Sequence, residues 1–121
     1  MINLCRTIAR ALSWLGALVI VVLSVVPAAD RPVTGAGSPL EHLAAFALVA
    51  GVFAVGYRLS LAARFMTALA FCAGVEVLQM PLPTRHARLG DFVIDLVTSW
   101  CAIAVVAGVE KLIAGDRQRH G

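Results

Sequence analysis

Four long runs of apolar residues, separated by short polar or proline-containing segments, make up most of the chain. The runs cover about residues 8–26, 40–57, 62–80 and 91–113. Each run approaches the roughly 20 apolar residues that a helix needs to cross a hydrocarbon core about 30 Å thick. In lipid, a single segment satisfies its own backbone hydrogen bonds only as a helix. The pattern therefore predicts an all-α fold, a four-span transmembrane helix bundle.

Proline marks the ends of these runs. Pro27 closes the first run, Pro39 precedes the second, and Pro81 and Pro83 follow the third. Because proline removes a backbone donor and clashes with the preceding turn, it is expected between helices rather than inside them. The four spans and their short connections use nearly the whole chain, so we expect one membrane domain over residues 1–121.

The composition supports a membrane protein and excludes several other classes. Hydrophobic residues make up 60% of the 121 residues and charged residues 14%, whereas a soluble domain carries about a quarter charged residues. The net charge is +3, but the basic residues are scattered in ones and twos between apolar runs. We therefore expect the lipid bilayer as the partner and no nucleic acid.

The three cysteines do not indicate a disulfide framework or a metal knuckle. They form an odd set without a CxxC pair, and Cys72 and Cys101 lie inside apolar runs. We expect these two to be small buried apolar residues and Cys5 to be an unpaired thiol. No metal and no cofactor is predicted.

The distribution of basic residues predicts the orientation, because cytoplasmic loops hold an excess of Lys and Arg. One side of the predicted bundle holds seven of them: Arg6, Arg10, Arg58, Arg64, Lys111, Arg117 and Arg119. The other side holds three: Arg31, Arg85 and Arg88. Both termini are therefore predicted to be cytoplasmic, with the loops that follow the first and third spans outside.

The first run has a second interpretation as a secretory signal peptide. It follows a basic N-terminus, and the small residues around Ala28 and Ala29 resemble a cleavage site. The run is long for a signal peptide, however, and Pro27 lies within the cleavage motif. We expect the segment to be kept as a first span; cleavage would leave three spans in the same orientation.

Polar residues gather at one end of the predicted bundle, near the outer face. They open the second span, close the third and open the fourth: Glu41, His42, Glu76, Gln79, Asp91 and Asp95. Ionisable residues inside a span are costly, usually face the bundle interior and mark candidate sites. Glu41 and Asp91 also suit helix N-termini, where carboxylates stabilise the dipole. Glu76 and Asp95 lie a turn or more inside the bilayer, where no cap requires them.

The short loop after the third span carries basic residues directly over this cluster. Several carboxylates in a low-dielectric site raise one another's pKa unless they are compensated. Arg85 or Arg88 folding back onto Glu76 or Asp91 would provide this compensation. A proton shared between Glu76 and Asp95 is the other solution. Arg64, by contrast, is interpreted together with Arg58 and Lys111 as a snorkelling anchor whose head group lies in water.

The order of these motifs resembles the VanZ-like family of small bacterial membrane proteins. The matching elements are Glu41-His42-x3-Phe46, Glu76-x2-Gln79, Pro83-x-Arg85 and Asp91-x3-Asp95. The resemblance covers about residues 40–108 and transfers His42, Glu76, Gln79, Arg85 and Asp91 as the family's polar set. The family usually has asparagine at the position of Asp95 and glycine at that of Thr98.

The resemblance implies a multi-pass protein of the bacterial inner (plasma) membrane. The founding member of the family is associated with low-level resistance to the glycopeptide antibiotic teicoplanin, so the resemblance also implies a link to resistance. It brings no established reaction or ligand.

Three hypotheses about function follow from the polar cluster. The leading one is a non-enzymatic envelope protein that binds the head group of an envelope lipid or lipid-linked precursor. Its candidate ligand-binding residues are His42, Glu76, Gln79, Arg85, Arg88, Asp91 and Asp95. The second is a membrane-embedded enzyme acting on a lipid-linked substrate, with Glu76 or Asp95 as general acid or base. The third is a structural assembly partner whose polar groups lock the helix ends together.

Overall fold

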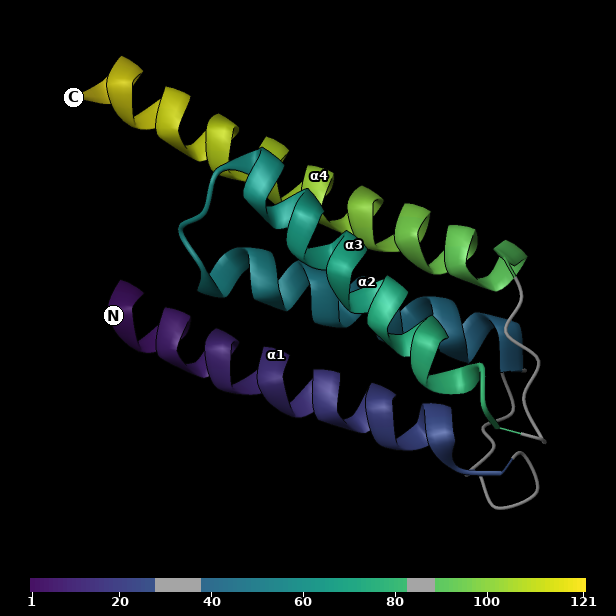
Figure 1. Cartoon of the computed structure of the whole chain (residues 1–121). Coiled ribbons are helices and arrows are strands. Elements are labelled where there is room, and N and C mark those ends of the chain that lie inside the picture. The colour runs from purple at the N-terminus through teal and green to yellow at the C-terminus, as the bar shows by residue number, and fades with distance from the viewer. Residues whose placement is uncertain (28–37, 83–88) are drawn as a thin grey trace.

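The structure, a computed structural model, describes residues 1–27, 38–82 and 89–121. These residues form four α-helices and no strand (Figure 1). The helices are α1 (Ile2–Val25), α2 (Ser38–Gly56), α3 (Leu61–Gln79) and α4 (Leu89–His120). The all-α fold predicted from the apolar runs is confirmed.

The helices run up and down in a bundle whose two ends differ. α2 packs against α1 and α4, while α3 packs against α4 and more lightly against α1. The N- and C-termini lie at the same end (Figure 1). We call this the terminal end; it also contains the turn at residues 57–60. The opposite end, where α1 and α3 finish and α2 and α4 begin, is called the loop end.

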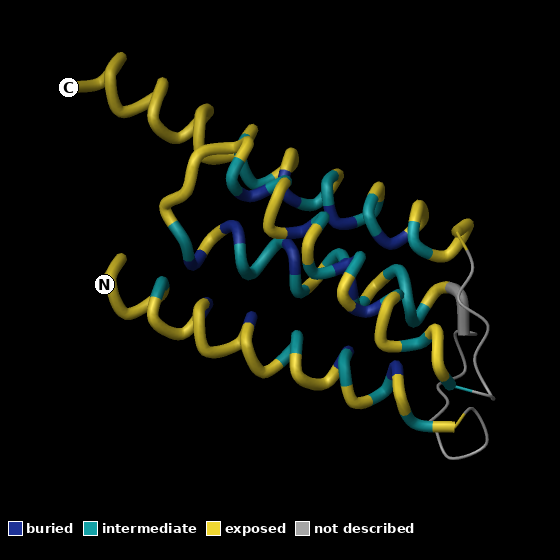
Figure 2. Tube along the Cα trace, in the orientation of Figure 1, coloured by how far each residue is buried: buried dark blue, intermediate teal, exposed yellow. Residues whose placement is uncertain are grey.

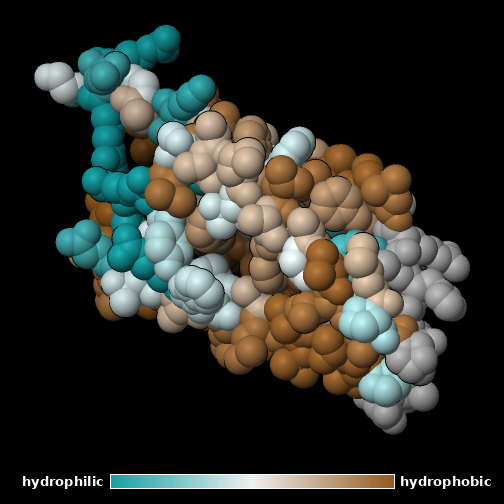
Figure 3. Space-filling view, in the orientation of Figure 1, coloured by the Kyte–Doolittle hydropathy of each residue, from teal (hydrophilic) through white to brown (hydrophobic). Residues whose placement is uncertain are grey.

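Three of the described helices, α1, α3 and α4, are long and apolar enough to cross a membrane, and the apolar part of α2, Leu40–Gly56, is shorter. The buried positions form only a narrow stripe on each helix (Figure 2). The surface seen in Figure 3 is broadly apolar over the middle of the bundle, with hydrophilic residues gathered at the terminal end. A surface of this kind suits lipid rather than water, and the chain has the character of a multi-pass membrane protein.

Two helices extend beyond the apolar runs that predicted them. α1 begins at Ile2 rather than near residue 8, and α4 continues past residue 113 to His120. The last turns of α4 are exposed and polar, and Asp116 lies 3.3 Å from His120 one turn later. The length of an apolar run therefore indicates how much of the helix suits the hydrocarbon core, and the helix itself continues into the polar residues on either side.

The core consists of two small clusters, one toward each end. The cluster toward the loop end contains Ile20, Phe46, Cys72 and Val75. The cluster toward the terminal end contains Ala50, Ala54, Ala68 and Ile103. Three of these four are alanines, and small residues let helix backbones approach closely in a membrane.

The prediction that Cys72 and Cys101 are both buried is correct for Cys72 and wrong for Cys101. Cys72 is buried in the core cluster toward the loop end, but Cys101 is exposed on α4. Both lie in apolar runs, but an apolar run does not specify which face of a lipid-bounded helix turns inward. Cys101 lies on the outer face.

Candidate functional site

The centre of the candidate site is a contact between His42 of α2 and Asp95 of α4. His42 Nε2 lies 2.9 Å from Asp95 Oδ1 and 3.0 Å from Oδ2. His42 lies about one turn inside α2 and Asp95 nearly two turns inside α4, so the close packing of these two helices brings them together at the loop end. The sequence placed both residues in one cluster but did not pair them.

The pair compensates a carboxylate that is removed from solvent. Asp95 is 4% exposed, and burying an isolated carboxylate in an apolar bundle is strongly unfavourable. An ionised carboxylate can only accept hydrogen bonds, so Nε2 must carry the hydrogen and donate it to Asp95. The contact therefore makes Nε2 of His42 a hydrogen-bond donor.

The imidazole is held in place on a second side by Phe46. The two ring centroids are 5.0 Å apart, and Phe46 is 2% exposed and part of the core. Even so, the His42 side chain remains 40% exposed. A ring that is oriented by a buried carboxylate and a buried aromatic, and still accessible, is suited to contacting a ligand.

Glu76 and Gln79 lie at the same end of the bundle, in the last turns of α3. Glu76 is half-buried, and its Oε1 is inaccessible to solvent. Gln79 Nε2 donates to the backbone oxygen of Ser24 at 3.4 Å, which links α3 to α1. Gln79 thus contributes to helix packing, a role that sequence reasoning did not predict.

The remaining predicted residues are at the rim or outside the described part of the chain. Asp91 is exposed in the first turn of α4, and Glu41 is half-buried in the first turn of α2. Both positions suit carboxylates at helix N-termini. Arg85 and Arg88 lie outside the described residues, so their compensation of the carboxylates stays a prediction. Among the described residues, no group of three or more His, Cys, Asp or Glu could hold a metal ion.

A second polar network, which the sequence did not predict, lies at the terminal end. Arg64 of α3 is 5% exposed and forms two hydrogen bonds with Glu110 of α4, Nη1 to Oε2 at 2.9 Å and Nη2 to Oε1 at 3.3 Å. Nη2 also donates to the backbone oxygen of Tyr57 at 3.1 Å. The interpretation of Arg64 as a snorkelling anchor was therefore wrong. Arg64 lies on the face of α3 that packs against α4, where the nearby carboxylate makes burial possible.

The same network attaches α1 to the end of α2. Arg10 Nε donates to the backbone oxygen of Gly56 at 2.9 Å, and its guanidinium carbon lies 5.0 Å from the centre of the Tyr57 ring. Trp14 Nε1 donates to the Tyr57 hydroxyl at 2.7 Å. The signal available in the sequence was the presence of Arg10, Tyr57, Arg64 and Glu110 at one predicted depth.

Comparisons of the chain with protein-family models, with curated proteins and with solved structures give no match. The resemblance carried by the four short motifs therefore stays a prediction.

Proposed function

We propose that the chain is a VanZ-like integral membrane protein of the bacterial envelope whose loop end binds the polar head group of an envelope lipid or lipid-linked precursor. One observation carries the proposal: the buried Asp95 carboxylate holds a histidine that is still 40% exposed. Ionisable groups at this depth are costly to keep in a membrane protein, and they are usually retained for a function.

The orientation assigned to the bundle follows from its charges. The positive-inside rule favours a cytoplasmic location for the terminal end, which contains Arg10, Arg58 and Arg64. The loop end then faces outward. In this orientation the site meets the outer leaflet and the lipids and precursors exposed there.

The chemistry of the site suits a head group that carries phosphate together with hydrogen-bond donors. As an imidazolium, His42 keeps Nε2 on Asp95 and donates its second N–H to the phosphate. The guanidinium groups of Arg85 and Arg88, which follow α3 in the sequence, add charge-assisted hydrogen bonds. Glu76 accepts hydrogen bonds from hydroxyl or amine groups of the ligand.

A structural role is the second candidate function, favoured by the closeness of the pair. The contact between His42 and Asp95 joins α2 to α4, so it stabilises the bundle whether or not a ligand binds. The two candidates differ in what a substitution at His42 removes. If the pair forms a lipid site, the substitution removes the bound lipid while the chain still folds. If the pair has only a structural role, bound lipid decreases only to the extent that the chain unfolds.

The experiment compares lipids that co-purify with the wild-type chain and with two variants, His42→Gln and His120→Gln, extracted in mild detergent and analysed by mass spectrometry. His120 is 79% exposed on its side chain and lies in the terminal turn of α4, so it serves as the matched control. We expect a phosphorylated lipid with the wild type and the control, and its loss from His42→Gln while the chain remains folded. An unchanged lipid content in folded His42→Gln would overturn the proposal.

A further inference from the structure

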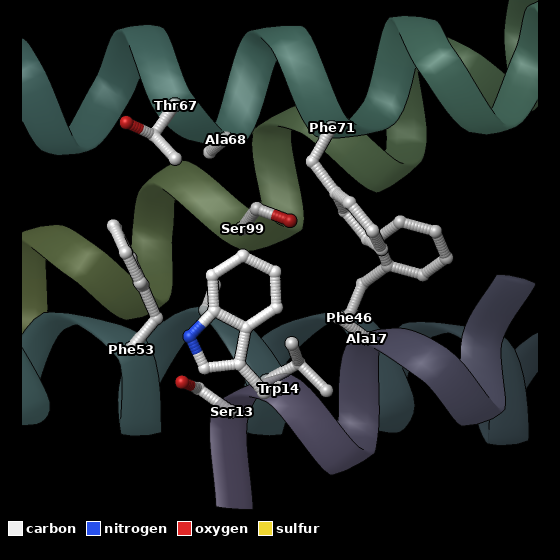
Figure 4. A pocket seen from close by; sticks show the side chains of 11 residues that line it. Ser13, Trp14, Ala17, Phe46, Phe53, Thr67, Ala68, Phe71 and Ser99 are labelled. Atoms are coloured by element: carbon white, nitrogen blue, oxygen red, sulfur yellow. The ribbon is translucent and has the colours of Figure 1, made fainter. Parts of the chain in front are cut away.

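An apolar pocket of about 140 Å³ lies between the helices, and Figure 4 shows the side chains that line it. Side chains from all four helices line it, mostly aromatic or small: Trp14, Ala17, Phe46, Phe53, Phe71 and Ser99. A cavity of about 150 Å³ with an apolar lining stays free of water and takes up benzene. This pocket is therefore suited to hydrocarbon.

The pocket reaches the outer surface between α1 and α3, the pair of packed helices with the lightest contact. Trp14 of α1 and Thr67 of α3 both line the pocket and are both exposed, so they border its opening. Figure 4 shows α3 above the pocket and α1 below it. Because these helices have the length and composition of membrane spans, the medium outside the opening is lipid.

We propose that this pocket takes up the hydrocarbon chain of the lipid whose head group lies at the His42–Asp95 site. The inference rests on the proposed function and names its ligand class: an amphiphile held at both parts. A helix from a second copy of the chain does not fit, because a helix is about 10 Å wide with its side chains. The hydrogen bond from Gln79 to Ser24 also joins α1 and α3 at the loop end.

The polar site and the pocket adjoin each other. The Phe46 ring lies beside both the imidazole of His42, with centroids 5.0 Å apart, and the ring of Phe71, with centroids 6.1 Å apart. Both phenylalanines line the pocket. On α4, Ser99 lines the pocket one helical turn after Asp95. The two parts of one amphiphilic ligand would thus be recognised by consecutive turns of the same helices.

The depth of the pocket matches one leaflet of a bilayer. At a rise of 1.5 Å per residue, the distance along α2 from His42 to Phe53 is about 16 Å. Half of a typical hydrocarbon core is about 15 Å thick. A lipid with its head group at the level of His42 therefore has its chain at the level of the pocket.

The test uses photo-crosslinking with a phospholipid that carries a diazirine in the middle of one acyl chain, in vesicles of phosphatidylethanolamine and phosphatidylglycerol. We expect adducts on Phe46 and Ala50, which line the pocket and are only 2% and 7% exposed. The variant Ala17→Phe fills the pocket and should lose these adducts. Leu18→Phe places the same ring on the exposed side of α1 and should keep them.

A second filling variant guards against a local folding defect. Thr67→Phe closes the opening from α3, where the residue is exposed, and it should lose the same adducts while the unfolding temperature is unchanged. A polyprenyl phosphate with a diazirine tests the other source of hydrocarbon; labelling of Phe46 or Ala50 by either probe supports the inference. Adducts confined to outward-facing residues such as Leu48, with both probes, would overturn it.

The variant His42→Gln separates this inference from the proposed function. We expect the bound head group and the acyl-chain adducts on Ala50 to be lost together in His42→Gln. Adducts that persist after the head group is lost would support the proposed function but overturn the assignment of both parts to one lipid. If wild-type chain retains a head-group-specific lipid but gives no adduct on Phe46 or Ala50, the proposed function stands and the pocket inference fails.

Discussion

His42 and Asp95 are separated by 53 positions in the sequence, yet the Nε2 atom of His42 lies 2.9 Å from the Asp95 carboxylate. The contact crosses the interface between α2 and α4 at the loop end. It makes a buried negative charge tolerable and at the same time orients a partly exposed imidazole. The stability of the bundle and the properties of the candidate site are therefore expected to change together when Asp95 is replaced.

Asp95→Ala should lower the free energy of unfolding by about 1–3 kcal/mol, because it removes the buried acceptor of a hydrogen bond involving a charged group. Asp95→Asn should cost much less, since the amide oxygen still accepts from His42 Nε2 and the side chain keeps its shape. Thermal unfolding in detergent micelles measures both. Asp91→Ala, at an exposed position one turn earlier, is the control and should change stability by only a few tenths of a kcal/mol to about 1. Equal losses for Asp95→Asn and Asp95→Ala would contradict a role for the retained oxygen.

Glu110→Gln should destabilise the terminal end, because it removes the charge that compensates the buried Arg64 guanidinium. Arg64→Lys should also destabilise, since an ammonium group does not reproduce two parallel hydrogen bonds to Glu110 together with one to the Tyr57 backbone. We expect about 1–3 kcal/mol for each from hydrogen bonds to charged groups, as measured by the unfolding temperature. Arg58→Lys, at an exposed position, is the matched control and should have no effect. An unchanged unfolding temperature for Arg64→Lys would show that the geometry of the pair is unimportant.

Gly56→Ala should separate α1 from α2. A Cβ atom at Gly56 would lie 3.0 Å from the backbone nitrogen of Arg10 and 3.3 Å from the backbone carbon of Ala9, and a backbone cannot rotate away as a side chain can. Overpacking of this kind costs about 1–3 kcal/mol. Gly51→Ala lies on the same helix with no atom within 4 Å of the added methyl group, so it should be neutral or stabilising. The unfolding temperature in detergent micelles measures both variants. An unchanged unfolding temperature for Gly56→Ala would argue against the close approach of Gly56 to the backbone of α1.

Reporter fusions test the orientation on which the outward-facing site depends. A reporter active only in the cytoplasm should be active when fused at either Met1 or Gly121, because both termini lie at the terminal end. A reporter active only outside the cytoplasmic membrane should be active when inserted in the loop between α1 and α2. The opposite pattern would place the candidate site on the cytoplasmic side.

The apolar runs were sufficient to predict four helices, and the proline positions were sufficient to place the end of α1, the start of α2 and the end of α3. The same runs did not predict that α4 continues to His120, because hydropathy reports where lipid ends rather than where a helix ends. They also did not distinguish buried Cys72 from exposed Cys101. In a bilayer both the lipid-facing and the protein-facing sides of a helix are apolar, so the usual amphipathic signal is absent.

The sequence predicted the depth of the candidate-site residues in the bundle, but it did not predict which of these residues contact one another. Spacing along the helices placed His42, Glu76 and Asp95 at one end of the bundle. Which of them meet depends on the order of helices around the bundle, with α2 beside α4, and no short motif encodes that order. The burial of Arg64 was missed for the same reason. Its partner Glu110 comes from α4, 46 positions later in the sequence, and no short motif links the two residues.

Native mass spectrometry of the chain released from vesicles that contain the lipids of a bacterial envelope tests the central claim most directly. We expect a bound phosphorylated lipid on the wild-type chain and on Arg64→Lys, which changes the terminal end. The lipid should be lost from His42→Gln, which changes only the loop end. Equal lipid occupancy on folded wild type and His42→Gln, or loss of the lipid from Arg64→Lys alone, would contradict a head-group site formed by His42 and Asp95.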